Sequence, residues 1–155
     1  MMTKIYKKLA GLTIASFILS GCNENMTYEY LMENPQVLKH EVLDCQSSTE
    51  KSQREISQCE IVMYAASNFN ALVTEQQSDP EKFGQRIMET ETTVATIKAS
   101  KIRAEQMLAT LKGKKASPAE MKSAQVAVDG FTKALRDKKT ELKILLAVMG
   151  LNSPE

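Results

Sequence analysis

The sequence predicts an all-α fold, in which a short disulfide-stapled helical hairpin precedes a long antiparallel helical hairpin that resembles a coiled coil. The first observation is composition: six glycines and four prolines occur among 155 residues, and residues that favour helix are frequent. The second is that apolar residues recur three and four positions apart over long stretches. The third is that three of these stretches begin with a capping residue followed by proline. Aromatic residues make up 5% of the chain and tryptophan is absent, so we expect an aliphatic core rich in methionine.

The first 21 residues resemble a secretory signal peptide. Three lysines lie within the first eight residues, and an apolar stretch over residues 9–19 follows them. This stretch is shorter than the ~20 residues of a membrane-spanning helix and fits the apolar region of a signal peptide. It ends in Leu19-Ser20-Gly21-Cys22, which resembles the lipobox of bacterial lipoproteins. We therefore expect cleavage after residue 21. The alternatives are an ordinary signal peptide with an incidental cysteine and a short core helix.

Cys22 would then become the lipid-carrying N-terminus of the mature chain. Its thiol can hold a diacylglycerol through a thioether, and an N-acyl chain would complete the modification; we expect no other cofactor. Each acyl chain contributes about 0.8 kcal/mol per buried CH₂, so several chains anchor a protein stably in a membrane. Because Asn23 and not aspartate follows, we favour the outer membrane, with the protein facing the periplasm. The periplasmic face of the inner membrane is the alternative.

Cys45 and Cys59 remain when Cys22 carries lipid. An even pair of cysteines in an oxidising compartment favours a disulfide. The disulfide would close a loop of about 15 residues and contribute about 3 kcal/mol. Unpaired thiols, redox chemistry and a metal site are the alternatives. The two cysteines lie too far apart in sequence for a thioredoxin-like pair, and His40 is the only histidine, so we expect no metal site.

The remaining chain divides into four segments. These are a tether over residues 22–33, the stapled hairpin over residues 34–78, the long hairpin over residues 79–150 and a tail over residues 151–155. The expected helices cover approximately residues 35–44, 53–77, 80–112 and 118–149. Gly150 stands where a glycine often ends a helix, so we expect it to cap the last one.

The two long helices carry apolar seams at coiled-coil spacing. Seven of the nine seam residues on the first helix are apolar: Phe83, Ile87, Thr90, Val94, Ile97, Lys101, Ala104, Leu108 and Leu111. Eight of nine are apolar on the second: Met121, Ala124, Val128, Phe131, Leu135, Lys138, Leu142, Leu145 and Met149. The short break between the helices, at residues 113–116, forces an antiparallel pair.

Further apolar residues lie outside the two seams, and two helices cannot bury all of them. Packing against residues 35–77, a second copy of the chain or a partner helix would cover the remainder. The residues that we expect at a partner surface are Ile102, Val126, Ile144, Leu146 and Val148. A homo-oligomer and a complex with an envelope or secretion-system protein are both open.

The sequence does not predict catalysis. Neither the nucleophile-elbow, phosphate-loop and zinc-protease motifs nor the glycine-rich dinucleotide turn occurs, so we expect no enzyme and no catalytic residue. His40 lies between two charged residues, which indicates a solvated position.

Without the signal peptide's lysines the chain has 17 basic and 19 acidic residues, a balance that gives no reason to expect nucleic acid. Lys112, Lys114 and Lys115 could meet phosphates or lipid headgroups, although a soluble loop also explains them.

Residues 19–66 carry an order of features that is found in one family. A lipobox, a short tether and an aromatic pair precede Glu33-Asn34-Pro35, a few aliphatic residues, one cysteine and a second cysteine in a helix with small residues. The residues are Cys22, Tyr28, Tyr30, Leu38, Val42, Leu43, Cys45, Cys59, Ala65 and Ala66. This order is similar to that of the EexN-type entry-exclusion lipoproteins, which are encoded beside conjugation and type IV secretion genes.

The resemblance implies a lipid on Cys22 and the family's paired-cysteine pattern at Cys45 and Cys59. It also implies a role in stopping a cell that carries a conjugative element from receiving that element again. The chain departs from the family pattern in two ways, since its aromatic cluster has no tryptophan and residues 80–149 have no counterpart.

We therefore expect a non-enzymatic envelope lipoprotein that binds another protein, in entry exclusion or another accessory role in conjugation or type IV secretion. The alternative is a structural coiled-coil lipoprotein of a secretion or envelope complex. A small-ligand binder similar to the lysozyme inhibitors is a third hypothesis. Those proteins are rich in β-strands, so a helical fold would argue against it.

Overall fold

The computed structural model describes residues 26–47 and 51–151, and over these residues it confirms the all-α fold. They form five helices and no strand: α1 Tyr28–Glu33, α2 Pro35–Ser47, α3 Gln53–Ser78, α4 Pro80–Gly113 and α5 Pro118–Leu151. The predicted signal peptide and Cys22 lie outside the described residues. Among the helices described, none combines the length and the apolar character that crossing a membrane requires.

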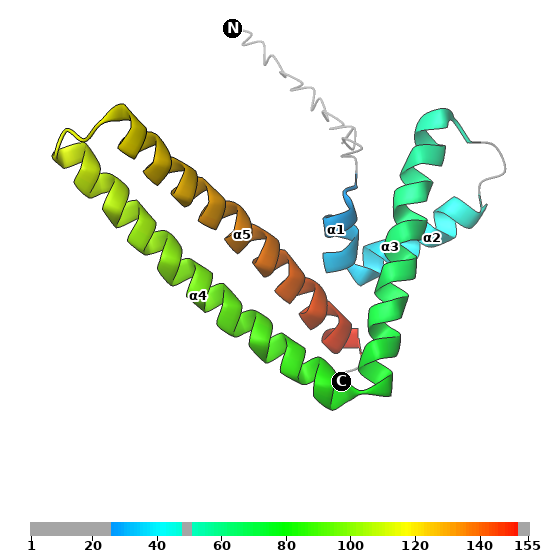
Figure 1. Ribbon diagram of the computed structural model, residues 1–155. Coiled ribbons are helices and arrows are strands. Elements are labelled where there is room, and N and C mark those ends of the chain that lie inside the picture. The colour runs from blue at the N-terminus through cyan, green and yellow to red at the C-terminus, as the bar shows by residue number, and fades with distance from the viewer. Residues whose placement is uncertain (1–25, 48–50, 152–155) are drawn as a thin grey trace, which may run out of the picture.

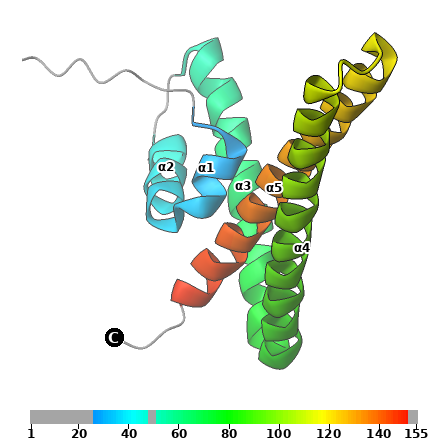
Figure 2. The ribbon, with the colours of Figure 1, turned by 90° about the vertical axis from the view of Figure 1, so that its left-hand side faces the viewer.

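The helices are arranged as a V (Figure 1). α4 and α5 run antiparallel, side by side, as one arm, and α3 forms the other arm. The arms meet at the turn between α3 and α4, and α1 lies between them in contact with both α3 and α5. α2 packs on α3, and in the turned view of Figure 2 it lies on the side of α3 opposite to α4.

The long hairpin confirms both predicted seams. Every seam residue of α4 is buried or half-buried, and so is every seam residue of α5 except Met149. Met149 is 36% exposed. Since neither seam contains a long polar run, the two helices can pack along their whole length in the way that a coiled coil does.

Local capping groups fix where the long helices begin. Asp79 directly precedes Pro80, the first residue of α4, and its carboxylate accepts a hydrogen bond from the backbone N–H of Lys82 at 3.0 Å. Ser117 and Glu120 form the predicted capping box at the start of α5, where Ser117 Oγ accepts from the Glu120 N–H at 3.3 Å and Glu120 Oε2 accepts from the Ser117 N–H at 2.9 Å. In the turn between α4 and α5, Lys115 has a φ of 52°, a left-handed conformation that reverses the chain.

The main core lies where the two arms meet. Its fully buried side chains come from α1, α3, α4 and α5 and are Leu31, Met32, Val62, Phe83, Leu145 and Val148. Partly buried residues such as Val73, Ile87 and Ile144 pack against them. Of the apolar residues outside the seam at this end of the long hairpin, Ile144 and Val148 are therefore covered within the chain, whereas Leu146 is 47% exposed. Packing against α3 was one of the alternatives that the sequence left open, and α1 adds to it.

The predicted tether over residues 22–33 is wrong for its second half, because residues 28–33 form α1. Thr27 caps this helix by accepting a hydrogen bond from the Tyr30 N–H at 3.2 Å. A helix of six residues is not stable by itself in water. The burial of Leu31 and Met32 in the core supplies the stabilisation that so short a helix lacks by itself.

Two predictions at the end of α5 are also wrong. Val148, predicted at a partner surface, is fully buried, because it packs in one core cluster with residues of α1 and α3 such as Leu31 and Val62. Gly150, predicted as a cap, lies inside a helix that continues to Leu151 and does not adopt a positive φ.

Candidate functional site

A groove of about 950 Å³ lies where the two arms meet. α1, α3 and α5 supply most of its lining, and α4 adds Arg86. The apolar part of the lining includes Tyr28, Met32, Leu72 and Ile144, and the polar part includes Asn68, Glu75, Arg136 and Asp137. A concave surface that combines apolar area with a few polar groups is the usual form of a binding site.

Arg86 connects three helices at this groove. Its Nη1 lies 3.0 Å from Glu75 Oε2 on α3, and its Nη2 lies 3.7 Å from Glu141 Oε1 on α5. Lys138 Nζ contacts the other oxygen of Glu141 at 2.6 Å. Each of these side chains is at least a third exposed, so water screens the pairs and each contributes only about 0–1 kcal/mol. The network therefore sets the charge pattern of the groove more than the stability of the fold.

The start of α1 is fixed to α3 by two polar contacts and one ring contact. Gln58 Nε2 donates to the carbonyl oxygen of Met26 at 3.0 Å, and Asn68 Nδ2 donates to the Tyr28 hydroxyl oxygen at 3.1 Å. The Tyr28 and Tyr64 rings lie 5.4 Å apart between centroids, which is within the range of favourable aromatic pairs. The first described residues, Met26 and Tyr28, therefore already contact α3.

Charged residues of α5 line one edge of the groove. Lys133 Nζ donates to Asp137 Oδ2 at 2.5 Å, and this hydrogen bond holds the pKa of Asp137 below its usual value. Arg136 Nε lies 3.7 Å from Asp137 Oδ1. Arg136 and Asp137 line the groove, and the ionised Asp137 carboxylate lies between Arg136 and Lys133, which is not part of the lining.

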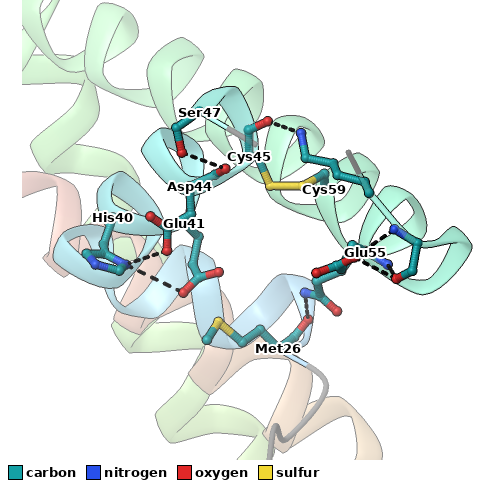
Figure 3. The surroundings of a disulfide bond; sticks show 11 residues. Met26, His40, Glu41, Asp44, Cys45, Ser47, Glu55 and Cys59 are labelled. Atoms are coloured by element: carbon teal, nitrogen blue, oxygen red, sulfur yellow. Dashed lines mark hydrogen bonds and ion pairs between the residues drawn. A yellow bond between two sulfur atoms is a disulfide. The ribbon is translucent and has the colours of Figure 1, made fainter. Parts of the chain in front are cut away.

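His40 lies on α2, away from the groove, and its side chain is 71% exposed, which confirms the predicted solvated position. Its Nδ1 lies 3.3 Å from Asp44 Oδ2 and 3.8 Å from Glu41 Oε1 (Figure 3). The three side chains stand close enough together for one ion to reach a ligand atom of each. All three come from successive turns of one exposed helix, so solvent competes for every ligand position, and we assign no metal to them.

The predicted disulfide between Cys45 and Cys59 is confirmed, with 2.04 Å between the sulfur atoms and 5.6 Å between the Cα atoms. It joins the end of α2 to the first turns of α3 (Figure 3). Lys51 Nζ donates to the carbonyl oxygen of Cys45 across the same junction. The disulfide therefore staples the short hairpin beside the connection from α2 to α3, where the near ends of the two helices meet, as the sequence predicts.

The structure separates the five residues predicted at a partner surface. Ile102 is 45% exposed, Val126 is 62% exposed and Leu146 is 47% exposed. Ile144 is half-buried and lines the groove, whereas Val148 is part of the core. Ile102, Val126 and Leu146 are therefore the predicted residues that remain exposed to a partner, although Val126 and Leu146 lie about 30 Å apart along α5.

The groove could not be predicted from the sequence, because it depends on α1 and on the angle between the arms. One signal was present: Glu75 and Arg86 are opposite charges that flank the predicted turn at Asp79-Pro80. Two helices that meet at such a turn bring residues at these positions close together. Nothing comparable in the sequence indicates Glu141, which lies far along the chain.

Comparison with protein families, with curated proteins and with solved structures finds no match to this chain. The resemblance to the EexN-type lipoproteins consequently rests on residues 19–66 alone.

Proposed function

We propose that this chain is a lipid-anchored protein of the bacterial envelope that binds another protein, in entry exclusion or another accessory role in conjugation or type IV secretion. The observation that carries the proposal is Leu19-Ser20-Gly21-Cys22, placed directly after a basic and then an apolar stretch. Charge, apolar length and the motif agree with one another, and a thiol at the fourth position is what lipid attachment requires. The proposed location is the periplasm-facing leaflet of the outer membrane.

Binding to a protein is the activity that the described surface supports best. The groove between the arms mixes apolar area with paired charges, and Ile102, Val126 and Leu146 add exposed apolar side chains on the long hairpin. Apolar side chains that are exposed on helices are typical anchors for a partner helix. The entry-exclusion role itself is supported by the order of cysteines and aromatic residues over residues 19–66.

A mating assay tests the exclusion role. Carrier cells from which the gene is deleted should take up the conjugative element more often than carrier cells that retain it. The intact gene should restore exclusion, whereas a Cys22→Ser variant should not, because the protein would lack its anchor. Unchanged uptake after deletion would contradict the exclusion role. The mass of the N-terminal peptide decides independently whether Cys22 is acylated.

The partner surface is tested in the same assay with the variant Ile102→Ser/Val126→Ser/Leu146→Ser. All three side chains are exposed, so the fold should tolerate the changes while the apolar contact area is lost. Leu43→Ser on α2 is the control for an exposed apolar-to-serine change, since Leu43 is 56% exposed and lies outside the long hairpin. Weakened exclusion in the triple variant alone supports this surface; equal exclusion in both variants contradicts it.

A structural role in a secretion or envelope complex is the second candidate. It is favoured by the continuous seams of α4 and α5, together with Met88 and Met107 on α4, which are 66% and 62% exposed. Helices with apolar residues outside an intramolecular seam can bundle with further helices. Chemical crosslinking in cells should then give discrete oligomers or stable capture of a large envelope complex.

A further inference from the structure

We infer that the turn between α4 and α5 is a second membrane contact, in which Lys112, Lys114 and Lys115 bind the headgroups of anionic phospholipids. The membrane in question is the one that holds the acylated Cys22, so the inference rests on the proposed lipid anchor. The basic turn is defined here as residues 112–116. The inferred membrane contact deepens the proposed function, because it gives the protein a defined orientation on the membrane surface.

Charge along the long hairpin is uneven, and the basic turn carries cations without any carboxylate beside them. Over residues 106–119 the only charged side chains are Lys112, Lys114 and Lys115, and all three are exposed. Around the opposite end, residues 75–90 carry four carboxylates and two cations, and residues 136–151 of α5 carry four cations and two carboxylates, so the charges balance there. An anionic surface therefore attracts the basic turn more than it attracts the opposite end of the hairpin.

The basic turn and the start of α1 lie on the same side of the molecule. Figure 1 shows α1 with its N-terminal end toward the open side of the V, where the turn between α4 and α5 also lies. The turned view in Figure 2 gives the same arrangement, with the α3–α4 turn at the opposite end.

The anchor and the described fold are separated by very little chain. Four residues lead from Cys22 to Met26, and a fully extended chain of this length spans about 14 Å. Met26 is already held to α3 by the hydrogen bond from Gln58. Because α1 begins toward the open side of the V, an acylated Cys22 within this distance of Met26 keeps the open side close to the membrane. This places the basic turn toward the headgroups and the turn between α3 and α4 away from them.

The chemistry of the basic turn fits an anionic headgroup. Ammonium groups near an anionic membrane each gain attraction that corresponds to roughly a fivefold change in the binding constant. This attraction falls off within a Debye length, so it requires proximity and weakens with salt. An anchored protein needs no more than this to hold one orientation, because the lipid already confines it to the surface.

Depth-dependent quenching tests the orientation on the full acylated protein, extracted from membranes and inserted into preformed vesicles. One fluorescent probe is attached at the basic turn through Ala119→Cys, and another near the opposite end through Gln77→Cys. Both residues are exposed.

The vesicles contain a brominated quencher lipid in phosphatidylcholine, with or without phosphatidylglycerol. Lys112→Gln/Lys114→Gln/Lys115→Gln is the test variant, and Lys82→Gln/Lys98→Gln/Lys139→Gln is its charge-matched control.

We expect strong quenching of the probe at residue 119 and little at residue 77, with phosphatidylglycerol increasing only the former. The test variant should lose this increase, by roughly fivefold per lysine in the contact equilibrium, and the control variant should keep it. An unquenched probe at residue 119 on a protein with acylated Cys22 would overturn the orientation but not the anchor. Equal quenching with and without phosphatidylglycerol would overturn the role of the lysines. An N-terminal mass without acyl groups would overturn both the anchor and the inference.

Discussion

Glu33 on α1 and Lys143 on α5 form an ion pair across the junction of the two arms, with 2.9 Å between Oε2 and Nζ although 110 residues separate them in the sequence. The pair lies beside the core that contains Leu31 and Val148. It ties the first helix of the fold to the last one. The position of α1, and with it the side on which the chain enters the fold, therefore depends on residues at the far end of the protein.

Reversing this ion pair should separate its contribution from that of the neighbouring core. Glu33→Lys and Lys143→Glu should each lower the free energy of unfolding by up to about 1 kcal/mol, because the Lys143 side chain is 64% exposed and water screens the pair. The double reversal should recover most of the loss, since it restores opposite charges. Urea denaturation of the four proteins at low salt measures this cycle. Strictly additive losses in the double variant would mean that the two side chains do not interact.

Removing the disulfide should destabilise the protein measurably. Cys45→Ala/Cys59→Ala should lower the free energy of unfolding by about 3 kcal/mol, because the unfolded chain regains the freedom of a loop of about 15 residues. Reductant should shift the urea midpoint of the parent protein by a similar amount and leave that of the double variant unchanged. A parent protein whose midpoint ignores reductant would show that the staple contributes nothing to stability.

The helices and the staple could be predicted from the sequence because their causes are local. Asp79 and Ser117 cap the long helices through neighbours within three residues, and the seam of α4 and α5 follows from spacing alone. α1 could not be predicted in this way. Its six residues are too few to form a helix without tertiary contacts, and those contacts come from α3 and α5.

The same reasoning explains which candidate site residues could be predicted. Ile102 and Val126 lie outside the seam in a part of the hairpin that no third helix covers, so periodicity alone indicated that they are exposed. Val148 has the same character in sequence, but it lies where α1 and α3 pack against α5. A period of three and four identifies the face of a helix; it does not show which stretch of that face another segment covers.

Two valines on α5 test this distinction with one substitution. Val148→Ala should lower the free energy of unfolding by about 2 kcal/mol, through lost burial and the cavity left behind. Val126→Ala removes the same atoms from a side chain that is 62% exposed, and its effect should stay within about 0.5 kcal/mol. Thermal or urea unfolding of both variants gives the comparison. Equal effects would mean that the end of α5 does not pack against α1 and α3.

The capping boxes at Ser52 and Ser117 should make stability depend on pH in the acid range. The hydroxyl and backbone N–H of each serine donate to the glutamate three residues later, which lowers the pKa of Glu55 and Glu120 below the ordinary 4.5. A lowered native pKa means that the folded state favours the ionised carboxylate. The stabilisation is therefore fully present above pH 4.5 and is lost as the pH falls through the lower native pKa values.

Urea midpoints measured across this range should decline toward acid in the parent protein. They should decline less in Glu55→Gln/Glu120→Gln and in Ser52→Ala/Ser117→Ala, which remove the carboxylate and its donor respectively. Variants with the parent's full acid loss would refute the assignment, because the decline would then come from other carboxylates.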